Sequence, residues 1–148
     1  MIDIEQFDHL GIRITDRDRA LDFYKILGFE IIAEVDFDAV IVLKNAQQVE
    51  LNLIVNGVDL TGGKNILMDV PEKHPGFTHV ALRVGSIVET IAALKENDIT
   101  ITQGPVTFGK DGHVSVFIRD PDRNTIELRG RLQDEEEIED LEFYDPNG

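Results

Sequence analysis

Two histidines and two glutamates stand inside apolar stretches of the sequence and are chemically able to bind a metal ion. His9 lies in FDHLGIRI and His79 in FTHVALRV, which share the order Phe, polar, His, apolar, small, apolar, Arg, apolar. Glu50 and Glu127 each stand between an apolar residue and a leucine, in VEL and IEL. If the segments that carry them converge, the four side chains suit an octahedral divalent ion with two positions left for water or substrate oxygens.

Each of these residues alone is weak evidence for a site. A carboxylate on the polar face of a strand is usually solvated, and a single histidine in a strand is more often a hydrogen-bonded bystander than a ligand. The combination is stronger, because a duplicated unit has little structural reason to keep both residue types at matching places. The pattern therefore predicts that each unit supplies one histidine from its first strand and one glutamate from its last.

Alternation and helical spacing indicate the elements that position these side chains. In an extended strand His79 shares one face with Ala81 and Arg83, while the intervening residues form an apolar back. A helix follows each repeat, capped at Thr15 or Asp16 and at Ser86. The expected strands are 7–14, 29–35, 39–43 and 49–55 in the first unit, and 77–84, 99–106, 114–118 and 125–129 in the second.

The fold class that follows is α+β, with two tandem βαβββ modules that form a curved, barrel-like sheet cup. We expect the first module over residues 1–55 and the second over 77–130. Residues 56–76, rich in Gly, Pro and Asn, predict a connecting loop. Residues 131–148 carry one basic and eight acidic side chains and predict a solvated tail. Part of this tail is apolar enough to dock as a short helix, through Ile138, Leu141 and Phe143.

Composition limits the partners of the chain. The sequence has no cysteine, which excludes disulfides and thiolate metal ligands. A net charge of −15 argues against nucleic acid and against anionic membrane surfaces, because binding to phosphate needs clustered Lys and Arg. No apolar stretch is long enough to span a membrane, and the acidic N-terminus does not resemble a secretion signal. We therefore expect a cytoplasmic protein that acts on a small molecule.

These motifs resemble the vicinal oxygen chelate superfamily, which includes glyoxalases, bleomycin-resistance proteins and dioxygenases. The similarity covers residues 7–130 and is most specific in FDHLGIRITDRDRALDFYKILGFE, GFTHVALRV and RDPDRNTIEL, and in the order His, Glu, His, Glu. Within the superfamily the acidic second ligand, Glu50, favours the branch of bacterial glyoxalase I, lactoylglutathione lyase.

The resemblance implies one divalent ion, Ni or Zn first and Co, Mn or Fe as alternatives, bound by His9, Glu50, His79 and Glu127. It implies a carbon-sulfur lyase that isomerises the hemithioacetal of an α-oxoaldehyde and a thiol through a metal-stabilised enediolate. Glu127 is then the leading catalytic base, and Glu50 serves the opposite face of the substrate.

The resemblance also implies residues that contact the substrate. Arg13 matches an arginine that binds the glutathione carboxylate. The asparagine of the family falls at Ile54, so Asn52 is a neighbouring candidate for the same contact. Lys110 lies in a Gly-rich loop where the family places an anion-binding side chain. The resemblance further implies a homodimer with twofold symmetry.

Two alternatives remain open at this point. One keeps the metal and changes the reaction to an epimerase, an isomerase, a dioxygenase or a thiol transferase acting on another small molecule. The other is a metal-free binding protein of the bleomycin-resistance type. Bound metal and isomerase activity distinguish the three hypotheses.

Overall fold

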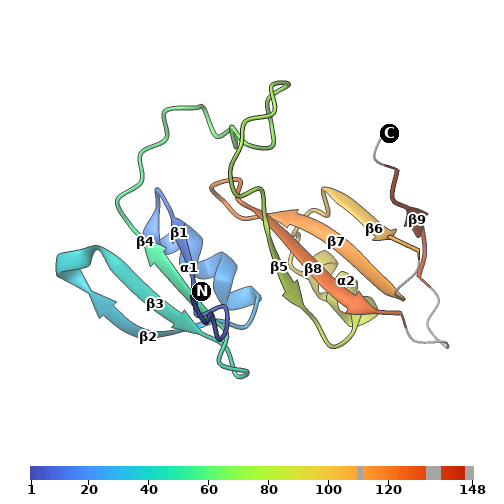
Figure 1. Ribbon diagram of the computed structural model, residues 1–148, viewed down its shortest axis with the longest axis horizontal. Coiled ribbons are helices and arrows are strands. Elements are labelled where there is room, and N and C mark those ends of the chain that lie inside the picture. The colour runs from blue at the N-terminus through green and yellow to red at the C-terminus, as the bar shows by residue number, and fades with distance from the viewer. Residues whose placement is uncertain (110–111, 133–137, 146–148) are drawn as a thin grey trace. The chain divides into compact units, whose positions relative to one another are not determined.

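The computed structural model describes residues 1–109, 112–132 and 138–145, and divides the chain into two compact units. The first unit is Met1–Gly63 and the second is Lys64–Gly148. Each unit has its own sheet with one long helix against it (Figure 1). In the part of the chain that the structure describes, no helix combines the length and apolar character needed to cross a membrane.

The first unit has the expected order β-α-β-β-β, with a short 3-10 turn before its third strand. Its sheet has the order β1-β4-β3-β2, in which β1 runs parallel to β4 and the other pairs are antiparallel. The elements are β1 (Leu10–Arg13), α1 (Arg17–Ile26), β2 (Glu30–Val35), η1 (Asp36–Asp38), β3 (Val40–Lys44) and β4 (Glu50–Ile54).

The second unit repeats this order and adds one strand from the C-terminal segment. Its sheet has the order β5-β8-β7-β6-β9, with β5 parallel to β8. The elements are β5 (Val80–Arg83), α2 (Ile87–Glu96), β6 (Gln103–Thr107), β7 (His113–Arg119), β8 (Thr125–Arg131) and β9 (Glu142–Phe143). The predicted α+β class with tandem βαβββ units is confirmed.

Both helices begin where the sequence predicts and for the reason it gives. The side chain of Asp16 accepts a hydrogen bond from the backbone N–H of Arg19, and Ser86 accepts one from that of Glu89. These contacts satisfy N–H groups that would otherwise have no partner in the first turn of the helix. Gly28 follows α1 with φ +92°, a left-handed conformation that favours glycine. The helices thus return the chain to the sheet and fix the position of the next strand.

Burial along β4 and β5 confirms the predicted alternation of apolar and polar side chains. In β4, Leu51 and Leu53 are buried while Glu50 and Asn52 are half-buried on the other face. In β5, Val80 and Leu82 are less exposed than Ala81 and Arg83. The polar face of β4 carries two of the predicted site residues, Glu50 and Asn52.

Three details of the predicted elements are wrong. The first strands are shorter than 7–14 and 77–84, so both histidines lie just before a strand; the parallel pairing begins only at Leu10 with Leu51 and at Val80 with Ile126. Residues 99–102 are not strand, and β6 begins at Gln103. In the tail, residues 142–143 form β9 instead of part of a helix, because they pair in parallel with Val106 and Thr107 of β6.

The segment that opens the second unit is braced against the β7–β8 turn. Arg119 donates from Nη2 to Oδ1 of Asp69 at 2.9 Å and from Nη1 to Oδ2 at 3.3 Å. The Asn65 side-chain amide donates to the carbonyl of Arg123 at 3.1 Å. Part of the predicted connecting loop is therefore held by the second unit, close in the chain to His79.

Candidate metal centre

The second unit brings His79 and Glu127 together. Nε2 of His79 lies 3.3 Å from Oε2 of Glu127. The glutamate side chain is only 8% exposed and the histidine side chain 37%, so the pair has a buried carboxylate and an accessible imidazole. Glu127 stands in the middle of β8, where its register partners are Ala81 on β5 and Phe117 on β7.

Two residues of the same sheet hold the Glu127 carboxylate. The hydroxyl of Ser115, which is fully buried on β7, donates to Oε1 at 2.7 Å. Nη1 of Arg129 lies 3.8 Å from the same oxygen. Because both contacts are made to Oε1, the second oxygen is turned toward His79.

The residue before His79 holds the imidazole from its other side. Oγ1 of Thr78 and Nδ1 of His79 are hydrogen-bonded at 2.9 Å. The Phe117 ring packs edge-on against the imidazole with 5.8 Å between centroids. When Nδ1 carries the ring proton and donates to Thr78, the lone pair of Nε2 faces Glu127, which is the arrangement that metal-binding histidines use.

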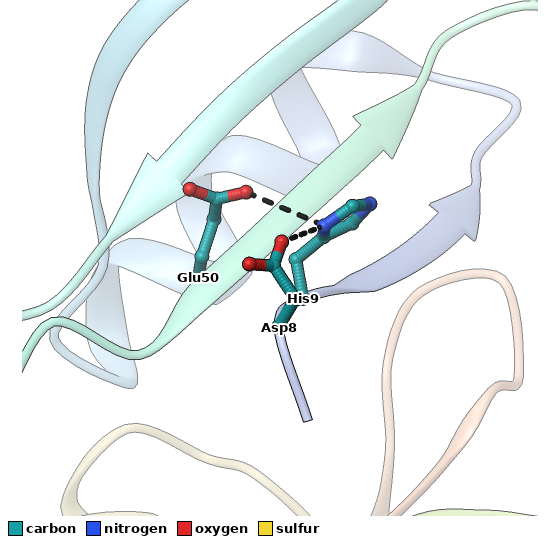
Figure 2. A group of neighbouring side chains, drawn as sticks. All are labelled: Asp8, His9 and Glu50. Atoms are coloured by element: carbon teal, nitrogen blue, oxygen red, sulfur yellow. Dashed lines mark hydrogen bonds and ion pairs between the residues drawn. The ribbon is translucent and has the colours of Figure 1, made fainter. Parts of the chain in front are cut away.

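The first unit brings together Asp8, His9 and Glu50 in a different way (Figure 2). Nδ1 of His9 lies 2.6 Å from Oδ2 of Asp8 and 3.7 Å from Oε2 of Glu50. Figure 2 shows the other ring nitrogen pointing away from both carboxylates. Nζ of Lys44 lies 3.7 Å from Oε1 of Glu50. Here one ring nitrogen is surrounded by carboxylates, and the site is more exposed than its counterpart.

The two glutamates do not occupy matching places in their sheets, contrary to the prediction. The register pairs Gly11 with Asn52 in the first unit and Ala81 with Glu127 in the second. Relative to the first strand, Asn52 therefore stands where Glu127 does, and Glu50 is two residues earlier. The echo of VEL and IEL in the sequence conceals this shift, because a shift of two residues keeps each side chain on the same face.

Both units nevertheless bring together side chains that are able to bind a divalent ion. Metal bonds to imidazole nitrogen and carboxylate oxygen are about 2.0–2.2 Å, so two ligand atoms on one ion lie roughly 3 to 4 Å apart. The His79–Glu127 distance falls in that range. In the first unit the ligand atoms of Asp8, His9 and Glu50 all lie within 4.8 Å of one another. The predicted ligands thus form two His–Glu pairs, one in each unit.

The three predicted substrate-binding residues differ in their surroundings and in whether the structure describes them. Nε of Arg13, which is exposed, donates to Oδ1 of Asn56 at 3.0 Å. Oδ1 of Asn52 is buried and has no hydrogen-bond partner among the described residues. Lys110 lies outside the described residues. The roles of Arg13 and Asn52 in substrate binding stay predictions.

Sequence reasoning missed the residues that orient the pairs. Asp8 and Thr78 occupy the polar place before the histidine in both repeats, which was a usable signal. Ser115 was also visible as a hydroxyl in the otherwise apolar run VSVFI. The position of Lys44 opposite Glu50 follows only from the antiparallel register of β3 and β4.

Comparison with known proteins identifies the class. The family model described as Glyoxalase/Bleomycin resistance protein/Dioxygenase superfamily matches residues 6–128, and the chain belongs to this superfamily. A glyoxalase domain-containing protein, RDO1, of Mycosarcoma maydis is 28% identical over 130 residues, covering 86% of this chain and 69% of its own length.

Solved structures share the glyoxalase-like fold. A glyoxalase/dioxygenase from Nostoc punctiforme has a TM-score of 0.69 at 19% identity, covering 86% of this chain and 92% of its own. A structure from the mobile metagenome of V. Pseudocholerae has a TM-score of 0.65 at 22% identity, covering 90% of this chain and 99% of its own. At these identities the similarity establishes the fold alone.

Proposed function

We propose that this protein is a metal-dependent enzyme of the glyoxalase I type, a carbon-sulfur lyase that isomerises the hemithioacetal of an α-oxoaldehyde and a thiol. The observation that carries the proposal is the His79–Glu127 pair, 3.3 Å apart, with the carboxylate nearly buried and oriented by Ser115. Superfamily membership supports a divalent metal, and the His and carboxylate donors fit Ni or Zn, with Co, Mn or Fe as alternatives. His9 and Glu50 are the proposed remaining ligands.

Glu127 is the proposed catalytic base. When bound, the metal polarises the substrate oxygens and makes the neighbouring C–H bond more acidic. Glu127 then moves the proton between adjacent carbons through Oε2, while Ser115 continues to hold Oε1. The low exposure of the carboxylate excludes most water from the proton transfer. Glu50, which is more exposed and is paired with Lys44, is proposed as a ligand first and as a base for the opposite face of the substrate second.

A specific observation keeps another metal-dependent reaction as the second candidate. Arg13, proposed to bind the glutathione carboxylate, already donates to Asn56, and the asparagine position of the family is occupied by Ile54. A thiol other than glutathione, or a different substrate for an epimerase, dioxygenase or thiol transferase, is compatible with the same ligands. We also propose a homodimer, on the resemblance to bacterial relatives, which size-exclusion chromatography with light scattering tests.

The deciding experiment measures bound metal and isomerase activity on one purified sample. The protein is stripped with a chelator and reloaded with Ni or Zn, and methylglyoxal with glutathione is the substrate. We expect one metal per complete ligand set and metal-dependent isomerisation. Stoichiometric metal without isomerisation would leave the metal centre intact and reject the glyoxalase assignment. Absence of metal binding would favour a metal-free binding protein of the bleomycin-resistance type.

A further inference from the structure

A cavity of about 470 Å³ opens beside His79 and Glu127, entirely within the second unit. Its volume lies within the range of small-molecule sites. Apart from His79 and Glu127, the described lining residues are largely aromatic and apolar, and Arg129 is the one cation among them. Phe108 and Tyr144 line it while remaining 41% and 47% exposed. Two half-exposed aromatic rings beside the charged side chains of Glu127 and Arg129 are typical of a surface that a ligand covers.

The C-terminal segment builds one wall of this cavity. β9 pairs with β6, and the backbone N–H of Tyr144 donates to the carbonyl of Thr107 at 2.9 Å. This anchor places the Tyr144 ring 5.0 Å from the Phe108 ring, measured between centroids. The tail, predicted to be a solvated appendage, therefore contributes an aromatic side chain next to the candidate metal ligands.

Arg129 gives the cavity its charge preference. Its guanidinium lies 5.5 Å from the centroid of the Phe108 ring and 3.8 Å from Oε1 of Glu127. Without metal, the Arg129 and Glu127 charges balance. A divalent ion bound by Glu127 would leave the lining with a net positive charge, so an anionic ligand is favoured over a neutral one. A guanidinium fork matches the two oxygens of a carboxylate.

We propose that this cavity binds the carboxylate arm of the substrate, with Arg129 contacting the carboxylate and Phe108 and Tyr144 enclosing the flat or apolar group attached to it. The inference deepens the proposed function, on which it rests for the position of the reacting carbons at the metal. It assigns Arg129 and Tyr144 as residues that determine which substrate is accepted.

The test uses phenylacetate and its neutral amide, phenylacetamide, as matched probes. Their dissociation constants are measured calorimetrically on the full chain, once stripped of metal and once loaded with zinc. We expect the acid to bind about tenfold or more tightly than the amide in the zinc-loaded form, since a hydrogen bond to a charged partner is stronger than a neutral one. In the stripped form the preference should be smaller, because the Glu127 charge offsets that of Arg129. Equal affinities for acid and amide would overturn the inference.

Variants identify which residues cause the preference. Arg129→Gln should remove the preference for the acid, and Arg129→Lys should keep part of it. Tyr144→Leu should weaken both probes about two- to tenfold, as loss of an aromatic contact does. Lys95→Gln, which removes an exposed cation on α2, is the control and should change neither constant. Unchanged binding to Arg129→Gln, or to Tyr144→Leu, would contradict the assignment of that residue.

The metal dependence separates this inference from the proposed function. An acid preference that depends on Arg129 but is accompanied by no isomerase activity would support the cavity and reject the glyoxalase assignment. Isomerase activity without an acid preference would support the glyoxalase assignment and reject the proposed role of the cavity. A preference seen only with zinc and unaffected by Arg129→Gln would mean that the carboxylate binds the metal, and would overturn the role of Arg129.

Discussion

The two units carry nearly the same histidine motif but build unequal sites from it. In the second unit a threonine holds Nδ1 of His79, and Nε2 faces a carboxylate that is 8% exposed. In the first unit Asp8 and Glu50 both approach Nδ1 of His9, and the carboxylate of Glu50 is 22% exposed. The second pair is preorganised for a metal through Nε2, whereas the first pair needs its imidazole to reorient before that nitrogen can share an ion with Glu50.

The difference originates in the residue before each histidine and in strand register. A threonine hydroxyl either donates or accepts, whereas the Asp8 carboxylate only accepts while it is ionised. The two-residue shift places Glu127 in the middle of its strand, next to Ala81, and leaves Glu50 at the start of β4. Similar sequences thus give one pair with a buried carboxylate held by a hydrogen bond, and one pair whose carboxylate is more exposed and whose imidazole must reorient.

The largest expected effect is a loss of turnover that distinguishes Glu127, the proposed base, from Glu50, proposed as a ligand first. Glu127→Gln should lower turnover by roughly 10²- to 10⁴-fold, the usual contribution of a general base, and should lower metal affinity much less. Glu50→Gln, the matched variant, should lower metal affinity as much as it lowers turnover. Single-turnover kinetics and a chelator competition assay measure the two quantities. Equal losses of turnover and of affinity in Glu127→Gln would mean that this residue is only a ligand.

The next effect tests the hydrogen bond from Ser115 to Glu127. Ser115→Ala removes the hydroxyl that orients Glu127, and should lower metal affinity or turnover about 10-fold, as loss of outer partners of a metal ligand does. Thr90→Ala is the control, because it removes a hydroxyl bonded to the carbonyl of Ser86 on α2. Zinc titration and steady-state kinetics measure both variants. If Ser115→Ala binds zinc and turns over like Thr90→Ala, Ser115 does not position the carboxylate.

A smaller effect is expected from the residues that hold the histidines. Thr78→Val should weaken zinc binding more than Asp8→Asn, because Thr78 keeps Nε2 of His79 facing Glu127 whereas His9 is not yet arranged in that way. We expect the two losses to differ about threefold, within the range for outer partners. Competition with a fluorescent zinc chelator measures them. A larger loss in Asp8→Asn would assign the ordered site to the first unit.

The smallest effect concerns the ion pair between Asp69 and Arg119, which holds the start of the second unit and depends on pH. Burial alone would raise the pKa of Asp69, but hydrogen bonds from the Asn65 N–H and from Arg119, with the charges of Arg119 and Arg123, lower it below 3.8 overall. A carboxyl whose pKa is lower in the folded chain than in the unfolded chain stabilises the fold at any pH above its unfolded pKa. This stabilisation is lost as the pH falls through the folded pKa.

Asp69→Asn should therefore lower the melting temperature at pH 7 by a few degrees, since an ion pair near the protein surface contributes about 1 kcal/mol or less. The difference from the unmodified chain should shrink as the pH falls through the lowered folded pKa of Asp69, because the carboxyl then becomes protonated in both states. Thermal melts by circular dichroism at several pH values measure this. A difference that does not change with pH would show that packing, and not the charge of Asp69, is responsible.

Much of the fold followed from the sequence, because the repeat, the helix caps and strand alternation are local signals. Asp16 and Ser86 begin their helices as expected, and the predicted ligands lie in β4 and β8 or directly before β1 and β5. The strand ends at His9 and His79 were not predictable, because they depend on where hydrogen bonding to a nonlocal strand begins. Nor was the shift between Glu50 and Glu127, since alternation is unchanged by two residues. The contact of the tail with β6 depends on a nonlocal pairing that composition does not encode.

The most direct test of the account is a zinc titration of His79→Ala and His9→Ala side by side, with circular dichroism confirming that both variants fold. Because His79 belongs to the ordered pair, its removal should cost more affinity than the roughly 10- to 100-fold that loss of an outer partner costs. Removal of His9 should cost about 10-fold or less. Equal losses, or a greater loss in His9→Ala, would contradict the claim that the His79–Glu127 pair leads the metal centre.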